Sequence, residues 1–239
     1  MTHSHAPRNR NRREDRTSHA YQRLRELIVH GRLAPGTWII ESDVAGRLGV
    51  SRTPVRAALQ RLEQEGYIVG TCRGQQVRSA VAPLTREDAH ELFVIVGQLE
   101  GLAAADAARL PAPVRDALIV DLHRLNDGFL AAASEHIYDP SRLFELDTAF
   151  HRRFVDAAAG PRVHALHEAI KPQAERYIRL YYTALIDEVV TSAREHGHIV
   201  DAIGGGDPAA AKEAVEVNWG NAAERLNRVI DKMGERGSW

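Results

Sequence analysis

Two groups of residues combine side-chain types and spacing that suit a chemical task. The first lies in the string VSRTPVRAALQRLEQEG, residues 50–66. If this segment is helical, one outward face carries Arg52, Thr53, Arg56 and Gln60. Arginine can donate two hydrogen bonds at once to O6 and N7 of guanine, and Ser51 and Thr53 can donate to phosphate beside the helix N-terminus. The face indicates base reading, the alternative being an exposed surface with interchangeable charges.

The second group is Asp147 and His151 in LDTAFHRRF, with His196 in SAREHGHIVDAI as a third member. Residues four apart project from the same helical face, so a carboxylate and an imidazole can share one cation. This combination suits a divalent transition metal such as zinc. The alternative is an ordinary surface hydrogen bond, because twelve histidines make chance pairs common.

The first group requires two short helices joined by a tight turn. Ser42 is expected to cap a helix that Gly49 ends. Ser51 is placed to cap the next helix, and Pro54 falls in its first turn, where the missing N–H does no harm. A buried stripe follows, consisting of Val55, Ala58, Leu59 and Leu62. This arrangement predicts a helix-turn-helix.

The flanking segments predict a small domain around this motif. Residues 1–17 are Arg-rich and lack apolar periodicity, which indicates a flexible basic arm. An amphipathic helix is expected from Ser18 to Gly31, and a short strand at residues 38–40. Residues 67–69 and 75–78 read as two strands around a turn at 71–74, which forms a β-hairpin wing.

The rest of the chain is expected to be helical. The pattern predicts an all-α antiparallel bundle of six or seven helices, at about 86–109, 112–133, 140–158, 162–184, 187–203 and 208–233. The fold class is therefore mainly α, with a small winged domain first. We expect the flexible basic arm at 1–17, a DNA-binding domain at 18–80, a linker at 81–85 and a helical domain at 86–235.

Charge divides the chain in the same place. Residues 1–80 hold 14 Arg and no Lys against 7 acidic residues, whereas residues 81–239 hold 17 basic against 25 acidic residues. This asymmetry suggests that the first part meets a polyanion. The single cysteine, Cys72, excludes an internal disulfide framework. No run of about 18 apolar residues is present, so we expect a cytoplasmic protein without a membrane span.

The segment from Ile28 to Val77, with GRLAPG, VSRTPVRAALQRLEQEG and RGQQV, resembles the winged helix-turn-helix of the GntR transcription regulators. The resemblance implies that Arg52 and Arg56 contact bases and that Arg47 contacts phosphate. It implies further contacts to backbone or groove from Ser51, Thr53 and the wing residues Arg73 and Gly74. Ser42 departs from the pattern, because relatives often carry an additional base-reading Arg there.

Residues 86 to about 230, with LDTAFHRRFVDAAAG and EHGHIVDAIGGGDPAAA, resemble the FCD effector domain of the FadR subfamily. The resemblance implies a metal held by Asp147, His151 and His196, with Asn218 at the fourth position. An amide oxygen is a poorer zinc ligand than imidazole. The site therefore binds weakly, binds with three protein ligands plus effector or water, or stays empty. Val96 stands where relatives often place an Arg that pairs with a carboxylate effector.

Other residues are candidates for the effector cavity. The long helix expected at 162–184 offers Arg176, Tyr177, Arg179 and Tyr181, although surface side chains would show the same pattern. His164, His167 and His198 are interpreted as surface residues.

Together these features predict a homodimeric repressor that binds double-stranded operator DNA and responds to a small-molecule effector, and not an enzyme. One alternative is a metal-dependent hydrolase or isomerase with an accessory DNA-binding domain, although no group near Asp147 is dedicated to general base work. Another alternative is an architectural DNA-binding protein without a sensor role.

Overall fold

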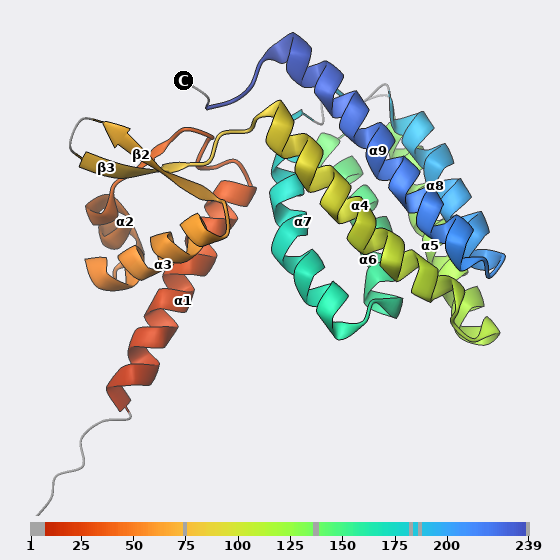
Figure 1. The fold of residues 1–239 in the computed structure, drawn as a ribbon, viewed down its shortest axis with the longest axis horizontal. Helices are drawn as coiled ribbons and strands as arrows, with labels where there is room; N and C mark the ends of the chain where they lie inside the picture. The colour runs from red at the N-terminus through yellow and green to blue at the C-terminus, as the bar shows by residue number, and fades with distance from the viewer. Residues whose placement is uncertain (1–7, 74–75, 136–138, 182–183, 186–187, 238–239) are drawn as a thin grey trace, which may run out of the picture. The chain divides into compact units, whose positions relative to one another are not determined.

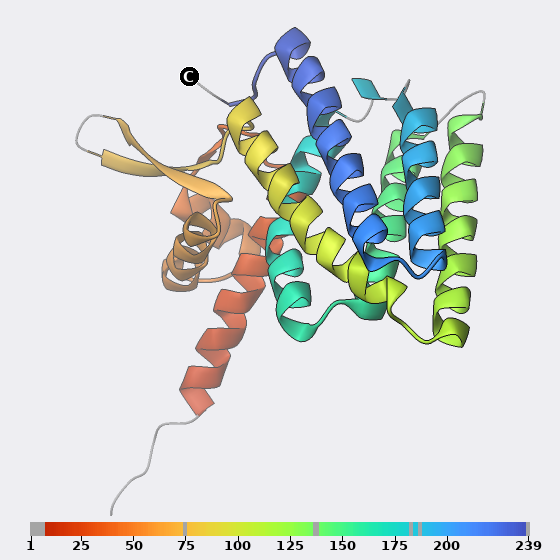
Figure 2. The ribbon, with the colours of Figure 1, turned by 45° about the vertical axis from the view of Figure 1, so that its right-hand side comes forward.

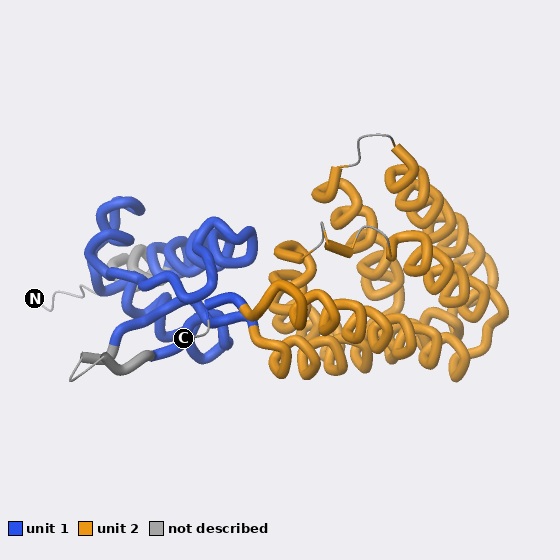
Figure 3. Tube along the Cα trace, turned by 90° about the horizontal axis from the view of Figure 1, so that it is seen from above, with its two compact units in different colours: residues 1–84, 236–239 blue, residues 85–235 orange. Residues whose placement is uncertain are grey.

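The computed structural model describes residues 8–73, 76–135, 139–181, 184–185 and 188–237, with the backbone alone for 8–14, 71–73 and 76–77. The chain divides into two compact units (Figure 3). The first comprises Met1–Leu84 with Arg236–Trp239, and the second comprises Thr85–Glu235. The predicted domain boundary at 85/86 therefore lies one residue from the boundary between the units.

The first unit is a winged helix-turn-helix. Its elements are α1 (Arg8–Val29), β1 (Trp38–Ile39), α2 (Glu41–Leu48), α3 (Arg52–Gln64), β2 (Ile68–Arg73) and β3 (Gln76–Val81) (Figure 1). The antiparallel sheet has the order β1-β3-β2, with Trp38 opposite Ala80 and Ile68 opposite Val81. The wing strands are longer than predicted, because residues 71–73 continue β2 instead of turning.

The predicted flexible arm is partly wrong, because α1 begins at Arg8 and runs without interruption through residues 8–17. No Pro or Gly interrupts residues 8–29, and the Arg and Glu residues of this segment are good helix formers. Helix formation there needs no buried stripe, which is why apolar periodicity did not reveal it. Residues 1–7 lie outside the described part of the chain.

The core of the first unit joins α1, α3 and the sheet. Leu24 and Ile28 of α1 pack with Val55 and Leu62 of α3, all at 2% exposure or less. The predicted buried stripe of α3 is thus confirmed. It fixes the rotation of the helix, so that the opposite face points to solvent.

The second unit is a helical bundle (Figures 1 and 2). Its described helices are α4 (Arg86–Ala108), α5 (Ala112–Ala133), α6 (Pro140–Ala158), α7 (Pro161–Tyr181), α8 (Val189–Gly204) and α9 (Pro208–Met233). These six helices match the predicted ranges closely, and the mainly α fold class is confirmed. Among the described residues, no helix is both long and apolar enough to cross a bilayer.

Helix α4 lies at the centre of the bundle and contacts α6, α7, α8 and α9. Small residues allow α9 to approach it closely. A Cβ added at Gly97 would lie 3.0 Å from Cβ of Trp219, so a larger residue would push the two helices apart. This approach brings the Trp219 indole within hydrogen-bond distance of Glu100.

Candidate DNA-reading helix and candidate metal site

The turn between α2 and α3 fixes how α3 presents its first residues. Gly49 ends α2 in the left-handed region, with φ 65°, and its N–H donates to the carbonyl of Ala45. Ser51 is the N-cap residue of α3, as predicted, but its hydroxyl makes no capping hydrogen bond. The N-terminus of α3 is therefore an exposed positive dipole end of the kind that binds phosphate.

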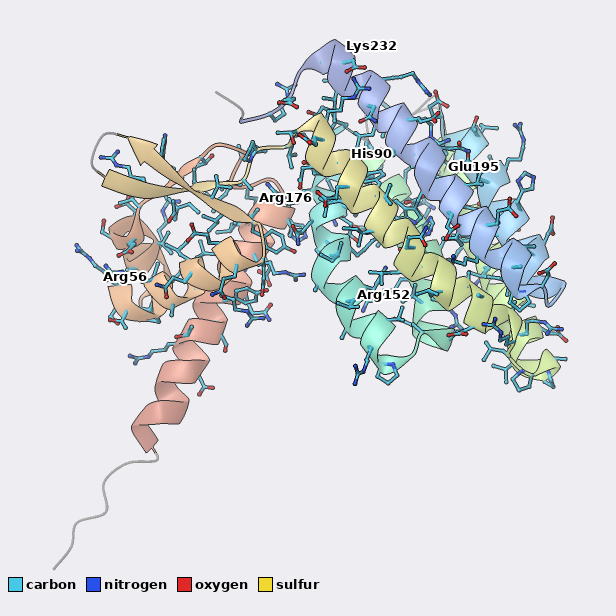
Figure 4. All side chains as sticks on the ribbon, viewed as in Figure 1. Arg56, His90, Arg152, Arg176, Glu195 and Lys232 are labelled. Atoms are coloured by element: carbon cyan, nitrogen blue, oxygen red, sulfur yellow. The ribbon has the colours of Figure 1, made fainter. Side chains whose placement is uncertain are left out.

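The structure brings most of the predicted DNA-reading residues to the outer side of this motif. The exposed residues on α2, its following turn and α3 include Arg47, Ser51, Arg52, Thr53, Arg56 and Gln60. Figure 4 shows Arg56 at the outside of the first unit. The side chain of Arg73 and the whole of Gly74 lie outside the described residues, so their predicted wing contacts stay predictions.

One local prediction for this motif is wrong. Ser42 does not cap α2, because the helix starts at Glu41 with Ile40 as its N-cap residue. The Ser42 hydroxyl donates instead to Asp43, at 3.3 Å. The carboxylate of Glu41, in the first turn, accepts two hydrogen bonds from Arg56, at 2.9 and 2.8 Å.

The three predicted metal ligands meet inside the second unit. Asp147 and His151 come from α6 and His196 comes from α8, and one ligand atom from each lies within 4.8 Å of the others. Oδ1 of Asp147 and Nε2 of His196 are 3.5 Å apart. Two ligands of a tetrahedral zinc ion are separated by roughly 3.3 Å. The other two separations, which do not exceed 4.8 Å, would have to contract toward this value for all three atoms to bind one ion.

The hydrogen bonds of His196 fix which ring nitrogen carries the proton. Its Nδ1 lies 3.1 Å from Oδ1 of Asn126, which can only accept, so Nδ1 is the donor. Stacking on Phe150, with ring centroids 4.1 Å apart, holds the ring in this orientation. Nε2 therefore presents a lone pair, is buried, and has no hydrogen-bond partner among the described residues.

Burial shifts the pKa values of His196 and of the neighbouring Asp147. Burial, followed by the charges of neighbouring groups, holds the pKa of His196 well below its usual value, so the ring stays neutral. Burial likewise raises the pKa of Asp147. Each shift is the response of a polar group that has lost water without gaining a partner. A divalent cation between the carboxylate and the lone pair would relieve both penalties, so these residues fit a metal.

A buried carboxylate, which the sequence analysis did not single out as a site residue, orients His151. Glu100 of α4 is fully buried and accepts from Nδ1 of His151, at 2.7 Å. The same Oε2 atom accepts from the indole of Trp219, at 2.7 Å. Because Nδ1 of His151 is occupied, Nε2 is the nitrogen left for a metal. A carboxylate behind a histidine ligand is a common way to fix its tautomer and orientation.

The other oxygen of Glu100 holds two side chains of α7. Oε1 accepts from Nε2 of His167, at 2.9 Å, and from Nζ of Lys171, at 2.7 Å. The interpretation of His167 as a surface residue is therefore wrong, because only 3% of it is exposed. His198 is exposed and His164 is partly exposed, with 39% of its side chain accessible, so both lie at the surface as predicted. Burial alone raises the pKa of Glu100, but the charges of Lys171 and His151 and the hydrogen bonds from His151 and His167 hold it well below its usual value.

Asn218, at the fourth position implied by the resemblance, belongs to a second polar network. Its side-chain nitrogen donates to Glu195, at 2.9 Å, as does that of Asn221. Arg225 makes a bidentate pair with the same carboxylate, at 2.8 and 2.9 Å. Figure 4 shows Glu195 between α8 and α9. A ligand role for the Asn218 carbonyl oxygen stays a prediction.

A cavity of about 60 Å³ adjoins Asp147. Its polar lining consists of Asp147, Glu188, Ser192 and Arg225, and its apolar lining of Phe93, Phe129, Ile178, Leu185, Val189, Ala222 and Leu226.

The four residues predicted for the effector are not among these lining residues. The hydroxyl of Tyr177 donates to Asp88 and that of Tyr181 to the carbonyl of Gly234, while Arg179 lies over the ring of Phe144. Arg176 is buried in α7.

Comparisons with known proteins agree with both units. Residues 16–74 match the family of bacterial regulatory proteins, gntR family, and residues 91–218 match the FCD domain. An uncharacterized HTH-type transcriptional regulator in an unstable DNA locus of Streptomyces ambofaciens is 30% identical over 209 residues, which cover 87% of this chain and 84% of that protein. The HTH-type transcriptional repressor RspR of Escherichia coli is 26% identical, over 87% of this chain and 88% of that protein. The structure of E. coli McbR/YncC shares the fold, with a TM-score of 0.67 at 19% identity, over 89% of this chain and 97% of the other.

A winged helix-turn-helix with an arginine-bearing recognition helix, joined to a helical domain with a buried polar site, defines a DNA-binding transcriptional regulator and not an enzyme. This class decides against the hydrolase or isomerase alternative. The chain belongs to the gntR family of bacterial regulatory proteins and carries an FCD domain in its second unit.

Proposed function

We propose that this protein is a cytoplasmic homodimeric repressor of the FadR subfamily that binds a pseudo-palindromic operator and responds to an organic acid or similar metabolite. The observation that carries the DNA-binding part is the exposed face of α3, on which Arg52 and Arg56 stand beside an uncapped helix N-terminus. In a dimer, two such helices can enter successive major grooves. Arg47, Ser51 and Thr53, with Arg73 and Gly74 in the wing, would contact phosphate or groove.

The sensing part rests on the orphaned Nε2 atom of His196, 3.5 Å from Asp147. A divalent metal ion, zinc among the candidates, would be held there by Asp147, His151 and His196. When bound, such an ion supplies positive charge to which an anionic effector group can bind. Glu100 holds His151 in the ligating orientation, and the adjoining cavity offers apolar walls for the body of a small effector.

Dimerisation is proposed through α4 and α9, which lie side by side in Figures 1 and 2. Three large apolar side chains on them are about half exposed: Val94 at 47%, Leu102 at 45% and Val217 at 50%. Large apolar residues left exposed to water on two neighbouring helices are candidates for a surface that a second copy covers.

A binding assay on duplex fragments from the region upstream of the protein's own gene tests the DNA-binding part. We expect Arg52→Ala to lower affinity for the bound fragment by roughly 5- to 150-fold and to relax its sequence preference. Arg109→Ala, which removes an exposed arginine from the second unit, serves as the matched control and should change neither quantity. Equal losses on the bound fragment and on random duplex would reduce Arg52 to a phosphate contact. The absence of any preferred fragment would support the architectural alternative.

A further inference from the structure

Arg56 of α3, one of the proposed base-reading residues, is hydrogen-bonded to the carboxylate of Glu41 in the preceding helix, α2. Nε of Arg56 donates to Oε1 of Glu41 at 2.9 Å, and Nη2 donates to Oε2 at 2.8 Å. The two side chains remain accessible, with 64% of Arg56 and 33% of Glu41 exposed. The pair is therefore a bidentate contact made at the surface that is expected to face DNA.

The atoms used by Glu41 determine which donors remain for DNA. A guanidinium group carries five N–H bonds in one plane. The contact with Glu41 uses one edge, formed by Nε–H and one N–H of Nη2. The opposite end keeps the second N–H of Nη2 and both of Nη1. A pair of parallel N–H groups at this end matches O6 and N7 of guanine. Glu41 thus fixes the plane and direction of the group without consuming the edge that reads a base.

The fold places Glu41 where it stays ionised. It lies in the first turn of α2, where the helix dipole favours a carboxylate. The hydrogen bonds from Arg56, and to a lesser degree the charges of Arg56 and Arg52, hold the pKa of Glu41 below its usual value. An exposed ion pair of this kind adds little to stability. Orientation of Arg56 is therefore the main consequence of the contact.

We propose that Glu41 is a specificity-determining residue, which positions Arg56 so that its end-on edge selects guanine at one position of the operator. The proposal rests on the proposed operator binding by α3. It makes Glu41 necessary for sequence preference although its negative charge opposes DNA binding in general. A carboxylate that only neutralised Arg56 would have the reverse effect, since its removal would strengthen binding to every sequence equally.

The test selects binding sites from a duplex pool randomised over two helical turns, with the wild-type protein and with Arg56→Ala. Comparison of the two selections identifies the operator position at which Arg56→Ala abolishes the preference for guanine. This position is changed from G·C to A·T in the duplex that the wild-type protein selects. Affinities for the original and the changed duplex are then measured. We expect the wild-type protein to prefer guanine by roughly 5- to 150-fold. Glu41→Gln should bring this preference close to that of Arg56→Ala, and should have no further effect in the Arg56→Ala background.

Two further variants separate orientation from charge and from folding. Glu41→Asp keeps the charge but is one methylene shorter, so it should lose guanine preference without a general gain in affinity. Glu26→Gln removes the same charge from the exposed Arg23–Glu26 pair of the first unit and should leave the preference unchanged. Circular dichroism confirms that each variant is folded, and Glu41→Asp carries the test if Glu41→Gln does not fold.

Three outcomes are distinguishable. Loss of guanine preference in Glu41→Gln and Glu41→Asp supports the proposal. Unchanged preference in both variants, even with higher affinity for all duplexes, overturns it and leaves operator binding intact. If the wild-type protein selects no sequence from the pool, the proposed operator binding itself fails before the role of Glu41 is reached.

Discussion

Replacing Glu100 with glutamine would remove one charge from the centre of the second unit and add two N–H groups where only acceptors fit. In the wild-type protein, Oε2 accepts from His151 and Trp219, and Oε1 accepts from His167 and Lys171. Glutamine keeps the shape of glutamate but has only one acceptor oxygen. The substitution therefore tests the donor pattern and not the packing.

Neither orientation of the new amide satisfies this pattern. If its nitrogen replaces Oε1, it faces the Lys171 ammonium, which can only donate. If its nitrogen replaces Oε2, it faces the indole N–H of Trp219, which also can only donate. In both cases Lys171, whose side chain is 8% exposed, loses its counter-charge. Removing one partner of a buried ion pair typically destabilises a protein by about 3–5 kcal/mol. The loss would be a large fraction of a total stability of about 5–15 kcal/mol.

Hydrogen exchange measured by mass spectrometry can locate this loss. We expect the free energy of opening to fall by about 3–5 kcal/mol in peptides from α4, α7 and α9. Peptides from α3 provide an internal reference, because they belong to the other unit. Since the folded-state pKa of Glu100 is depressed, its stabilisation is present above the unfolded-state pKa of about 4.3 and is lost as the pH falls through the folded value. The difference between wild type and Glu100→Gln should therefore shrink in acid.

A second substitution should repair most of the damage. In Glu100→Gln with Lys171→Met, the amide oxygen can accept from His151 and Trp219. The amide nitrogen can donate to Nε2 of His167, because histidine can move its proton to the other ring nitrogen. No charge then remains unpaired in this cluster, but the repair is partial, because Nδ1 of His167, which would carry the proton, has no hydrogen-bond partner among the described residues. A single variant as stable as wild type, or a double variant as unstable as the single one, would refute the reasoning.

The remaining predictions concern the metal, the dimer and the first unit. His151→Ala should abolish bound divalent metal in elemental analysis but retain the DNA affinity of the effector-free protein, whereas His164→Ala, at a partly exposed position, should keep the metal. Unchanged metal content in His151→Ala would remove the assignment. Leu102→Glu should convert the dimer to monomers in sedimentation, and an unaffected dimer would place the interface elsewhere. Burial, and then the hydrogen bond and charge of Glu65, raise the pKa of Tyr21 to about 12. The contribution of Tyr21 to the free energy of unfolding is therefore present below the unfolded-state pKa of about 10. It is lost as the pH rises through the folded-state pKa. Urea denaturation across that interval should show this loss in wild type but not in Tyr21→Phe, and identical curves would contradict it.

Local signals explain why helix α3 could be predicted from the sequence. The turn at Gly49, the N-cap Ser51 and the spacing of Val55 and Leu62 all act within one or two helical turns. The helix starts of the second unit were equally local, since Pro140 and Pro208 stand at the first helical position, preceded by Asp residues whose side chains cap the helices.

The polar cluster around Glu100 could not be read in this way. Its members come from four helices, and Glu100 is separated by 51 residues from His151 and by 119 residues from Trp219. His167 and Lys171 do show a local signal, because they lie four apart on the face of α7 that also buries Ala174. Sequence spacing alone does not distinguish such a buried polar pair from a solvated one, since the partner carboxylate belongs to another helix.

The pairing of the buried cations bears on how an anionic effector could be held. Among the described residues that line the cavity, Arg225 is the one cation, and Glu195 already neutralises it through two hydrogen bonds. Lys171 is likewise neutralised by Glu100. Val96, at the position where related domains often have an arginine, is fully buried and supplies no charge. Releasing either cation would leave a buried carboxylate without its counter-charge, at a cost of several kcal/mol, although other hydrogen bonds to it would remain. If the proposed metal is bound beside Asp147, we expect it to supply the attraction for an anionic effector, and metal binding and effector binding would then be coupled.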